Sequence, residues 1–417
     1  MQILDNSLRD QIGETFVSQK QFSEQLRKSE YKERLQILKR FEEVFRSSFD
    51  EMYEAAAKDF CRPKTEVDMT EIMVVLSELA IVRKNLKKWM KPKKVLPTLL
   101  LFGTSSQIIK EPKGVTLIIS PWNYAFNLTF NPMISAIAAG NTVIIKPSEH
   151  SPNMSRVIEK IVSDSFESKH VSIFQGDSSV AEHLTNMPFD HIFFTGSPEI
   201  GKHVMSAAAK NLSSVTLELG GKSPVVIHES ADLEKAADAI VFSKFLNNGQ
   251  TCIAPDYLLV QNSVSDEFLK QIKTSIKKQF GEDDQMINND DYGRLVTNAH
   301  YARINSLLNE SIKDGADVVI GGVTDEADKY ISPTVIRNIK PDSAIMNNEI
   351  FGPLLPIVQF EDINEAISLI NSKPKPLALY LFGSESAVMN NIIKSTSSGD
   401  ACINQCAVHF LHHNLPF

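Results

Sequence analysis

Hydrophobic residues recur with two different spacings along the 417 residues of this chain. From Asn6 to about Trp89 the spacing is that of amphipathic helices, with many Glu, Lys and Arg residues in between. The pattern is interrupted near Cys61-Arg62-Pro63, where a proline is expected to end a helix. This region therefore predicts a helical N-terminal layer.

Short apolar runs and helix-spaced segments alternate in the rest of the chain. The first set of runs covers 115–119, 142–145, 171–174 and 191–194. The second set begins near Ser223 and covers 224–227, 257–261, 355–360 and 377–382. Strands that alternate with helices are typical of parallel, doubly wound sheets, so we predict an α/β fold with two such domains.

Two connecting stretches lie outside these domains. Lys91-Pro92-Lys93 ends the helical pattern, and Gly103-Thr104 fits a turn between two extended segments, so 95–114 predicts a protruding hairpin. The junction near 218–222 separates the two α/β domains. Clefts between domains are where ligand sites concentrate, which directs attention to the motifs around this junction.

Composition narrows the class of protein. Hydrophobic residues make up 42% and charged residues 23% of the chain, close to globular averages, so we expect it to fold throughout. A net charge of -8, with basic residues scattered among acidic ones, argues against nucleic-acid or anionic-membrane partners. Four widely spread cysteines make no disulfide framework and fit a reducing cytosol. No signal-peptide pattern is visible, and no apolar window approaches the roughly 20 residues of a membrane span.

The segment NNGQTC at 247–252 places a cysteine just past a glycine that ends a helix-spaced apolar run. A cysteine used for packing normally lies inside such a run, so this position favours a presented nucleophile. A thiol reacts as its thiolate, and its usual pKa of about 8.5 requires help from amide dipoles, a cation or a base. Cys252 is therefore the first candidate for chemistry.

A glycine loop, GSPEIGK at 196–202, follows the run at 191–194 and opens a helical pattern, a context in which free amides bind anions. An ATP phosphate loop needs Ser or Thr after the lysine to hold magnesium, and His203 stands there instead. The dinucleotide fingerprint GxGxxG is absent from the chain, so a nicotinamide cofactor would bind by a variant of that fold. A purely structural glycine turn is the alternative.

Polar residues also follow two other apolar runs. Asn123 comes after 115–119, at a strand end where open sheets bind ligands, and its amide is a candidate oxyanion donor. Capping of the next helix is the commoner use of such a residue, and spacing alone favours the cap. Lys146 and Glu149 come after 142–145 and could contact phosphate or ribose, or form a solvated ion pair.

Glu218, in LELGGK at 217–222, lies in an apolar setting beside two glycines. Desolvation there would raise its pKa toward neutrality and make it a general base, and a surface glutamate is the equally weighted alternative. NEIFGP at 348–353 is turn-like and carries Glu349 and Phe351.

The tail gathers potential metal ligands, namely Cys402, Cys406, His409, His412 and His413. Their CxxxCxxHxxH spacing matches no common zinc pattern. We therefore expect no metal site.

Taken in order, six segments resemble the aldehyde dehydrogenase superfamily. They are PWNY at 121–124, KPSE at 146–149, FTGSPEIGK at 194–202, LELGGKSP at 217–224, NNGQTC at 247–252 and NEIFGP at 348–353. The stretch 121–149 looks most like the class 3 branch, which includes the fatty aldehyde dehydrogenases. The similarity runs from about residue 10 to the end of the chain.

The resemblance implies a role for each candidate. Cys252 would attack the aldehyde carbon, with the oxyanion held by the Asn123 amide and the Cys252 backbone N–H. Glu218 would deprotonate the water that releases the acid from the thioester, with NAD or NADP as hydride acceptor and no metal. The cofactor would contact Trp122, Lys146, Glu149, Gly196, Ser197, Gly201, Leu219, Glu349 and Phe351.

The resemblance also implies the domain roles and the setting. A variant Rossmann cofactor-binding domain would comprise 1–94 and 115–218, an oligomerisation hairpin 95–114, the α/β catalytic domain 219–399 and a return segment 400–417. Members of the family continue past Phe417, so the chain is expected to be shortened. It would be a cytoplasmic homodimer acting on small aldehydes, with no nucleic-acid partner and no visible membrane anchor.

Three functions are open at this point. The first is NAD(P)-dependent oxidation of aliphatic or aromatic aldehydes to carboxylic acids, and the second is a shortened, catalytically impaired nucleotide-binding homologue. The third is a cofactor-independent cysteine hydrolase that uses Cys252 and Glu218. It is disfavoured because such enzymes usually pair the cysteine with a histidine, and the six segments contain none.

Overall fold

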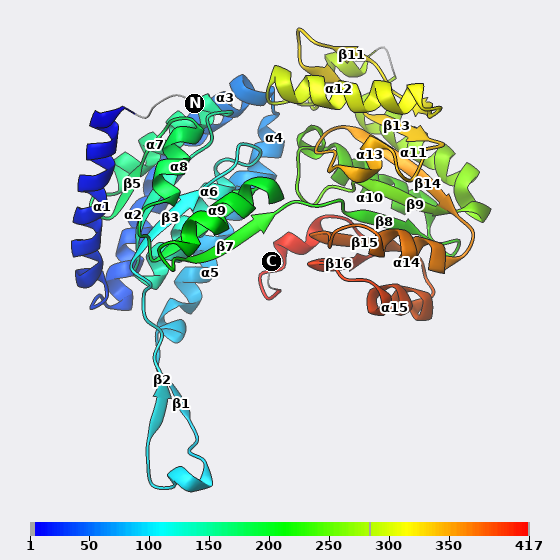
Figure 1. Cartoon of the computed structure of the whole chain (residues 1–417). Helices are drawn as coiled ribbons and strands as arrows, with labels where there is room; N and C mark the ends of the chain where they lie inside the picture. The colour runs from blue at the N-terminus through cyan, green and yellow to red at the C-terminus, as the bar shows by residue number, and fades with distance from the viewer. Residues whose placement is uncertain (1–4, 283–284, 416–417) are drawn as a thin grey trace. The chain divides into compact units, whose positions relative to one another are not determined.

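The computed structural model describes residues 5–282 and 285–415 of the chain. The chain forms two compact units, each described below by itself. Unit 1 comprises Met1–Ala56 and Val67–Glu218, and unit 2 comprises Ala57–Glu66 and Leu219–Phe417. Figure 1 shows the elements of both.

Unit 1 holds, among its described residues, a five-stranded sheet with the order β5-β4-β3-β6-β7. The strands are β5 (Val171–Ile173), β4 (Thr142–Lys146), β3 (Val115–Ile119), β6 (His191–Gly196) and β7 (Ser214–Leu219). The neighbours from β5 to β6 run parallel, and β3 and β4 are buried along their whole length. Strands covered on both faces read as continuous apolar runs, which is why these were predicted, whereas half-buried β7 was not.

Helices pack against this sheet and form the N-terminal layer (Figure 1). The layer consists of α1 (Asn6–Leu26), α2 (Tyr31–Ser47), the first part of α3 (Phe49–Phe60), a π-helical turn at Asp68–Ile72 and α5 (Met73–Trp89). The end of α3 and most of α4 (Lys64–Val67) belong to unit 2. The helices between strands are α6 (Asn127–Ala139), α7 (Pro152–Ser165), α8 (Ser178–Thr185) and α9 (Pro198–Ala209). The predicted helical layer and the alternation that follows are confirmed.

The segment Ala57–Glu66 belongs to unit 2, although the sequence assigned all of 1–94 to one domain. The carbonyl oxygen of Phe60 accepts a hydrogen bond from the Arg294 N–H at 2.7 Å. A Cβ atom on Gly293 would lie only 3.2 Å from the same oxygen. Helical periodicity carries no information about such a distant partner, so the sequence could not place this boundary.

A two-stranded ribbon occupies the region for which the sequence predicts a hairpin. Strand β1 (Lys93–Val95) pairs antiparallel with β2 (Ser106–Ile108), and the ribbon extends away from the helices of unit 1 (Figure 1). Leu99 and Leu100, in the short 3-10 helix at its tip, are 95% and 97% exposed. A role of this ribbon in oligomerisation stays a prediction.

A buried carboxylate holds the N-terminus of α6, the helix that follows the Asn123 loop. Glu71 Oε2 accepts from the N–H groups of Phe126 and Asn127, both at 2.9 Å. The N-cap of α6 is Phe126, so the cap that spacing favoured at Asn123 is wrong. A carboxylate can satisfy two N–H groups at once and also complements the helix dipole, whereas an asparagine cap satisfies one.

A buried guanidinium holds the other end of α6. Arg34 Nη1 donates to the Ala138 carbonyl oxygen at 3.0 Å, and the helix ends at Gly140, which is left-handed with φ 89°. A Cβ atom on Gly140 would lie 2.6 Å from the Arg34 guanidinium carbon, so glycine is required there. The Glu71 carboxylate at the N-terminus of α6 and the Arg34 guanidinium at its C-terminus thus fix the helix and the loop before it.

In the described part of unit 2, the seven-stranded sheet has the order β10-β13-β14-β9-β8-β15-β16. The strands are β10 (Asp317–Ile320), β13 (Thr334–Arg337), β14 (Leu354–Phe360), β9 (Tyr257–Gln261), β8 (Pro224–Ile227), β15 (Ala378–Phe382) and β16 (Asp400–Ile403). All run parallel to their neighbours except β10. The predicted α/β fold with parallel sheets is confirmed, and β16 adds part of 400–417 to the sheet.

The helices of unit 2 pack against this sheet and include α10 (Leu233–Phe245), α11 (Ser265–Phe280), α12 (Asn298–Lys313), α13 (Ala344–Asn347), α14 (Ile363–Asn371) and α15 (Ser386–Ser395). A small ribbon pairs β11 (Thr324–Asp325) with β12 (Tyr330–Ile331). Across residues 5–282 and 285–415, no helix combines the length and the apolar character that crossing a bilayer requires.

Alternate residues of the central strands of unit 2 enter two different cores. Val225 and Ile227 of β8 belong to one core, and Val226 belongs to the other. Strand β9 repeats the division, with Leu258 in the first core and Leu259 in the second. Both faces of the sheet are therefore buried, which explains the unbroken apolar runs in the sequence.

Replacing Glu71 with alanine is expected to destabilise unit 1, because two buried N–H groups lose their acceptor. The expected loss is about 1–3 kcal/mol, measured as a decrease in the free energy of unfolding in urea. Glu78→Ala is the matched control, since Glu78 lies at the surface of the neighbouring helix and accepts only from the Ser135 hydroxyl. Equal shifts for the two variants would contradict the capping role.

Candidate active site

The cysteine loop begins where α10 ends. Asn247, Asn248 and Gly249 are all left-handed, with φ of 50°, 58° and 73°. Asparagine and glycine adopt this region at the least cost, so the NNG sequence suits the turn. The turn leads to Cys252, which is partly buried.

A buried side-chain amide fastens this loop. Gln250 Nε2 donates to the carbonyl oxygens of Asn247 and Arg294 at 3.0 and 3.1 Å. Gln250 Oε1 accepts from the Val296 N–H at 3.0 Å. An amide with three buried hydrogen bonds restricts the backbone around it, so the loop holds Cys252 in one place.

The cysteine loop packs against the NEIFGP segment. A Cβ atom on Gly249 would lie 2.3 Å from the Gly352 carbonyl oxygen, so only glycine permits this approach. Phe351 is also left-handed, with φ 51°, and its carbonyl oxygen lies 2.7 Å from His300 Nε2. Left-handed backbone is unusual for a bulky side chain and is concentrated at functional sites.

The Glu349 carboxylate packs against the double glycine of LELGGK. A Cβ atom on Gly220 would lie 2.3 Å from Glu349 Oε1, and the same oxygen accepts from the Gly221 N–H at 3.2 Å. Burial raises the pKa of Glu349 to about 7, and the nearby Asp256 carboxylate adds to the effect. A carboxyl group that ionises near neutral pH is thus held where Gly220 leaves room for it.

Three predicted motifs meet at one edge of the unit 2 sheet. Within unit 2, the GGK part of LELGGK, NNGQTC and NEIFGP precede β8, β9 and β14, which are adjacent and parallel. Parallel strands bring their amino ends to the same edge, so the three incoming segments converge. The sequence named these motifs, but their convergence depends on a strand order that it did not give.

The predicted residues of unit 1 follow the carboxyl ends of the strands of their sheet, whereas the unit 2 motifs precede the amino ends. Strand β3 lies between β4 and β6. After β3 the chain adds β4 and β5 on one side of it and then β6 and β7 on the other side. The crevice at the carboxyl ends of such strands is the usual ligand position in open sheets. Trp122 and Asn123 follow β3, and Gly196 ends β6.

Lys146 and Glu149 form an ion pair after β4, with Nζ and Oε2 2.6 Å apart. The lysine side chain is 4% exposed and the glutamate side chain 37%, so the pair is not the solvated one that was the alternative. The exposed carboxylate leaves the pair accessible to a ligand.

Ser197 caps the helix that follows β6. Its hydroxyl accepts from the Ile200 N–H at 3.4 Å, and Pro198 occupies the first turn of α9. A Cβ atom on Gly196 would lie 2.6 Å from the Phe194 ring, so the glycine is required by packing as well. Gly201 is buried one turn into the helix. A capped helix N-terminus with exposed residues 197–200 is suited to an anion.

Glu218 lies in β7 and is half-buried. Burial raises the pKa of its carboxyl group, in the direction that the apolar sequence around it indicated. Glu218 is the last residue of unit 1 and Leu219 the first of unit 2. The approach of Glu218 and Asn123, both in unit 1, to Cys252 in unit 2 stays a prediction.

The cysteines and histidines of the tail do not assemble into a metal cluster. Cys402 Sγ lies 3.3 Å from His409 Nδ1, a contact between one thiol and one imidazole. Among residues 5–282 and 285–415, no group of three or more His, Cys, Asp or Glu side chains could hold a metal ion.

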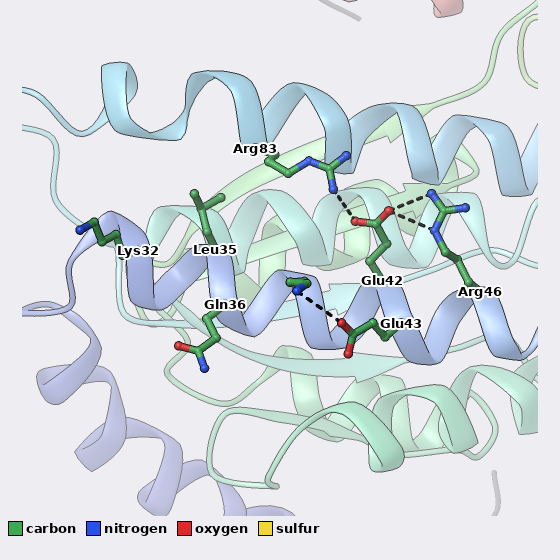
Figure 2. A pocket seen from close by; sticks show the side chains of 8 residues that line it. Lys32, Leu35, Gln36, Glu42, Glu43, Arg46 and Arg83 are labelled. Atoms are coloured by element: carbon green, nitrogen blue, oxygen red, sulfur yellow. Dashed lines mark hydrogen bonds and ion pairs between the residues drawn. The ribbon is translucent and has the colours of Figure 1, made fainter.

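A surface hollow of about 600 Å³ lies on unit 1 between α2 and α5. Figure 2 shows the ion pairs along it, in which Glu42 contacts Arg46 and Arg83, each at 2.8 Å. Its lining includes no residue of the six motifs, so the hollow is distinct from the candidate site.

Comparison with known proteins places the chain among aldehyde dehydrogenases. The model of the aldehyde dehydrogenase family matches residues 7–417. AldX of Bacillus subtilis is 43% identical over 414 residues, covering 99% of this chain and 93% of AldX. The 4,4'-diaponeurosporen-aldehyde dehydrogenase of Staphylococcus aureus is 42% identical, covering 97% of this chain and 87% of its own length. Aldehyde dehydrogenase family 3 member A2 of Pongo abelii is 40% identical, with coverage of 92% and 78%.

Solved structures agree with these relatives. The substrate-bound state of Staphylococcus aureus AldH matches with a TM-score of 0.94 and 42% identity, covering 97% of this chain and 88% of that one. An NADP-dependent enzyme of E. coli matches with a TM-score of 0.87 and 25% identity, with coverage of 95% and 82%.

Replacing Gly249 with alanine is expected to displace the cysteine loop, because a Cβ atom would strike the Gly352 carbonyl oxygen. The rate at which iodoacetamide alkylates Cys252, followed by mass spectrometry of its peptide, should change, with a stability loss of about 1–3 kcal/mol. Gly315→Ala is the control, because Gly315 is also left-handed (φ 102°) but has nothing within 4 Å of its Cβ position. An unchanged alkylation rate in Gly249→Ala would show that this contact does not hold the loop.

Replacing Glu349 with glutamine is expected to stabilise the free protein at high pH only. The folded carboxyl has a pKa of about 7 against an ordinary value of 4.5, so its ionisation opposes folding increasingly as the pH rises between these values. Glutamine keeps an acceptor for Gly221 without the charge, so melting should occur a few degrees higher at pH 8 and almost unchanged at pH 4, below both pKa values. Glu361→Gln, at an exposed carboxylate, is the control and should leave the melting temperature unchanged at both pH values. An equal rise in melting temperature at both pH values in Glu349→Gln would contradict the argument.

Proposed function

The chain belongs to the aldehyde dehydrogenase family, and we propose that it oxidises aldehydes to carboxylic acids with NAD or NADP through a thioester on Cys252. The observation that carries the proposal is the convergence of the cysteine loop, the double glycine and Glu349 at one edge of the unit 2 sheet. The comparisons give no support to the catalytically impaired alternative.

The residues present fit a nicotinamide dinucleotide. In unit 1, the α9 N-terminus with Gly196, Ser197 and Gly201 suits the pyrophosphate, and Lys146 with Glu149 suits the adenosine ribose. In unit 2, Glu349 lies against a glycine surface that a Cβ atom would fill, which suits the nicotinamide ribose. Trp122, Leu219 and Phe351 complete the set of cofactor contacts.

The first half-reaction forms a bond between Cys252 Sγ and the aldehyde carbon. The thiol proton passes to solvent and the carbonyl oxygen becomes an oxyanion, which accepts hydrogen bonds from the Asn123 amide and the Cys252 N–H. When bound, NAD or NADP would accept the hydride that this carbon loses as the oxyanion reforms a carbonyl group. The carbon bound to sulfur is then a thioester carbon, at the oxidation level of a carboxylic acid.

The second half-reaction releases the acid. A thioester needs an activated nucleophile, and Glu218 takes a proton from the water that attacks it. A carboxylate with its pKa raised by burial is a stronger base than an exposed one, and it is active only above that pKa. The chain therefore needs a deprotonated Glu218 for turnover.

The setting of the enzyme is also part of the proposal. The substrates are aliphatic or aromatic aldehydes, and the relatives, which are named as aldehyde dehydrogenases, support aldehydes as the substrate class. The exposed ribbon of β1 and β2 joins two copies into a cytoplasmic homodimer.

An aldehyde panel with both cofactors, read by NAD(P)H absorbance, tests the proposal. Cys252→Ala should lower kcat by at least about 10³-fold with cofactor binding retained, while Cys61→Ser, at an exposed cysteine, should keep full activity. Glu218→Gln should give one rapid burst of NAD(P)H and then stall, because acylation survives and hydrolysis does not. In the native enzyme the steady-state rate should rise with pH through a pKa above 4.5.

Turnover by Cys252→Ala, or no turnover by the native chain on any aldehyde, would refute the proposal. Ester hydrolysis at full rate without a nicotinamide cofactor would favour the cysteine hydrolase instead.

A further inference from the structure

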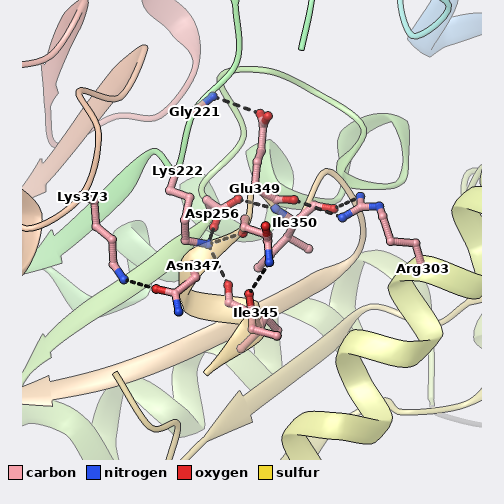
Figure 3. A network of polar contacts seen from close by, with 11 residues as sticks. Gly221, Lys222, Asp256, Arg303, Ile345, Asn347, Glu349, Ile350 and Lys373 are labelled. Atoms are coloured by element: carbon pink, nitrogen blue, oxygen red, sulfur yellow. Dashed lines mark hydrogen bonds and ion pairs between the residues drawn. The ribbon is translucent and has the colours of Figure 1, made fainter. Parts of the chain in front are cut away.

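A single buried ammonium joins three segments of unit 2. Lys222 is 6% exposed, and its Nζ donates to Asp256 Oδ1 in a short contact and to the carbonyl oxygens of Ile345 and Asn348, both at 2.8 Å. Figure 3 shows Lys222 at the centre of this network. All three ammonium donors are therefore used, one toward Asp256 and two toward the segment that holds Ile345 and Asn348.

The partner carboxylate continues the network. Asp256 is 4% exposed, and its second oxygen accepts from the Ile350 N–H at 2.9 Å. Asp256 lies four residues after Cys252, immediately before β9. The pair of Lys222 and Asp256 thus ties the segment that carries the nucleophile to the segment that carries Glu349.

Basic side chains hold the backbone on both sides of Glu349. The four consecutive carbonyl oxygens of residues 348–351 each lie within hydrogen-bond distance of a basic side chain. Lys222 takes the first at 2.8 Å, Arg303 the second and third at 3.2 and 2.5 Å, and His300 the fourth at 2.7 Å. Hydrogen bonds at four successive carbonyl oxygens restrict the rotation of this backbone, and so restrict the points from which the Glu349 and Phe351 side chains extend.

We propose that Lys222 is a positioning residue of the active site, which fixes the Glu349 segment to the Cys252 segment so that both meet one cofactor and substrate. The proposal rests on the function proposed above. Lys222 touches no reacting atom in this role and acts through Asp256 and the backbone at 345–350. Its loss should therefore loosen Glu349 and Cys252 together.

Lys222→Met, which keeps an unbranched side chain only one heavy atom shorter and removes the charge, tests this role. We expect at least a tenfold rise in the Kd and KM of NAD+ and NADP+, and a changed rate of Cys252 alkylation by iodoacetamide. Lys373→Met is the matched control, because Lys373 Nζ contacts only the exposed side-chain oxygen of Asn347, at 3.0 Å, within the same network (Figure 3). The control should stay within twofold of the native protein in all these measurements.

A pH profile separates positioning from general support of the fold. Charged groups that act on Glu349 are Asp256, Lys222, Arg303 and Lys244, and the Lys222 charge favours its ionised form. The midpoint of the pH dependence of cofactor binding should therefore move to higher pH in Lys222→Met. A loss of stability alone would leave this midpoint in place.

The outcomes are decisive even when a variant folds poorly. If Lys222→Met does not fold, Lys222→Met/Asp256→Leu removes both charges and leaves no buried ion without a partner, and it is read in the same way. A folded variant with cofactor affinity and Cys252 alkylation within twofold of native would overturn the positioning role. Because binding and alkylation need no turnover, an absence of aldehyde oxidation by the native chain would refute the proposed function and leave this test intact.

Discussion

The ion pair between Lys222 and Asp256 is the interaction on which the geometry of the unit 2 site depends. Removing two charges from water costs several kcal/mol per ion, and their attraction offsets this only when other hydrogen bonds complete the shell. Two carbonyl oxygens and one N–H complete it here. Such a pair contributes little net stability, but it fixes one arrangement of three segments that are far apart in the sequence. Geometry, more than stability, is what this interaction supplies.

The two sheets present their functional residues at opposite edges, and the reason lies in what each edge offers. In unit 1 the residues follow the strands, where the N-terminus of a helix such as α9 offers its positive dipole end to a ligand. In unit 2 the motifs precede β8, β9 and β14, where the Glu349 carboxylate packs against Gly220 and the cysteine loop packs against Gly352. The unit 1 edge is therefore suited to binding phosphate groups. The unit 2 edge places the Glu349 carboxylate and the Cys252 thiol where the proposed function puts the nicotinamide ring.

The sequence predicted the parts of the fold whose signal is local. Strands buried on both faces appear as apolar runs, whereas half-buried β7, edge strand β16 and the unit 2 segment Ala57–Glu66 depend on distant partners. The same division holds in the site. The apolar surroundings of Glu218 indicated the direction of its pKa shift, because desolvation is a local effect. Local patterns gave no sign of Lys222 and Asp256, which are separated by 34 residues, or of Glu71, which caps a helix 55 residues away.

Glu349 illustrates how desolvation can outweigh charge. Lys222 and Arg303 both favour its ionised form, and so does the Gly221 N–H, yet the pKa is raised to about 7. Burial wins because the carboxylate has lost most of its water, and one N–H at 3.2 Å replaces only part of it. A ligand that brings hydroxyl donors to this carboxylate would supply the missing hydrogen bonds and lower the pKa again. Ionisation of Glu349 and binding of a ligand at its site are therefore linked. Because hydrogen bonds restrict the backbone around Glu349, the loop does not need to rearrange when the ligand binds.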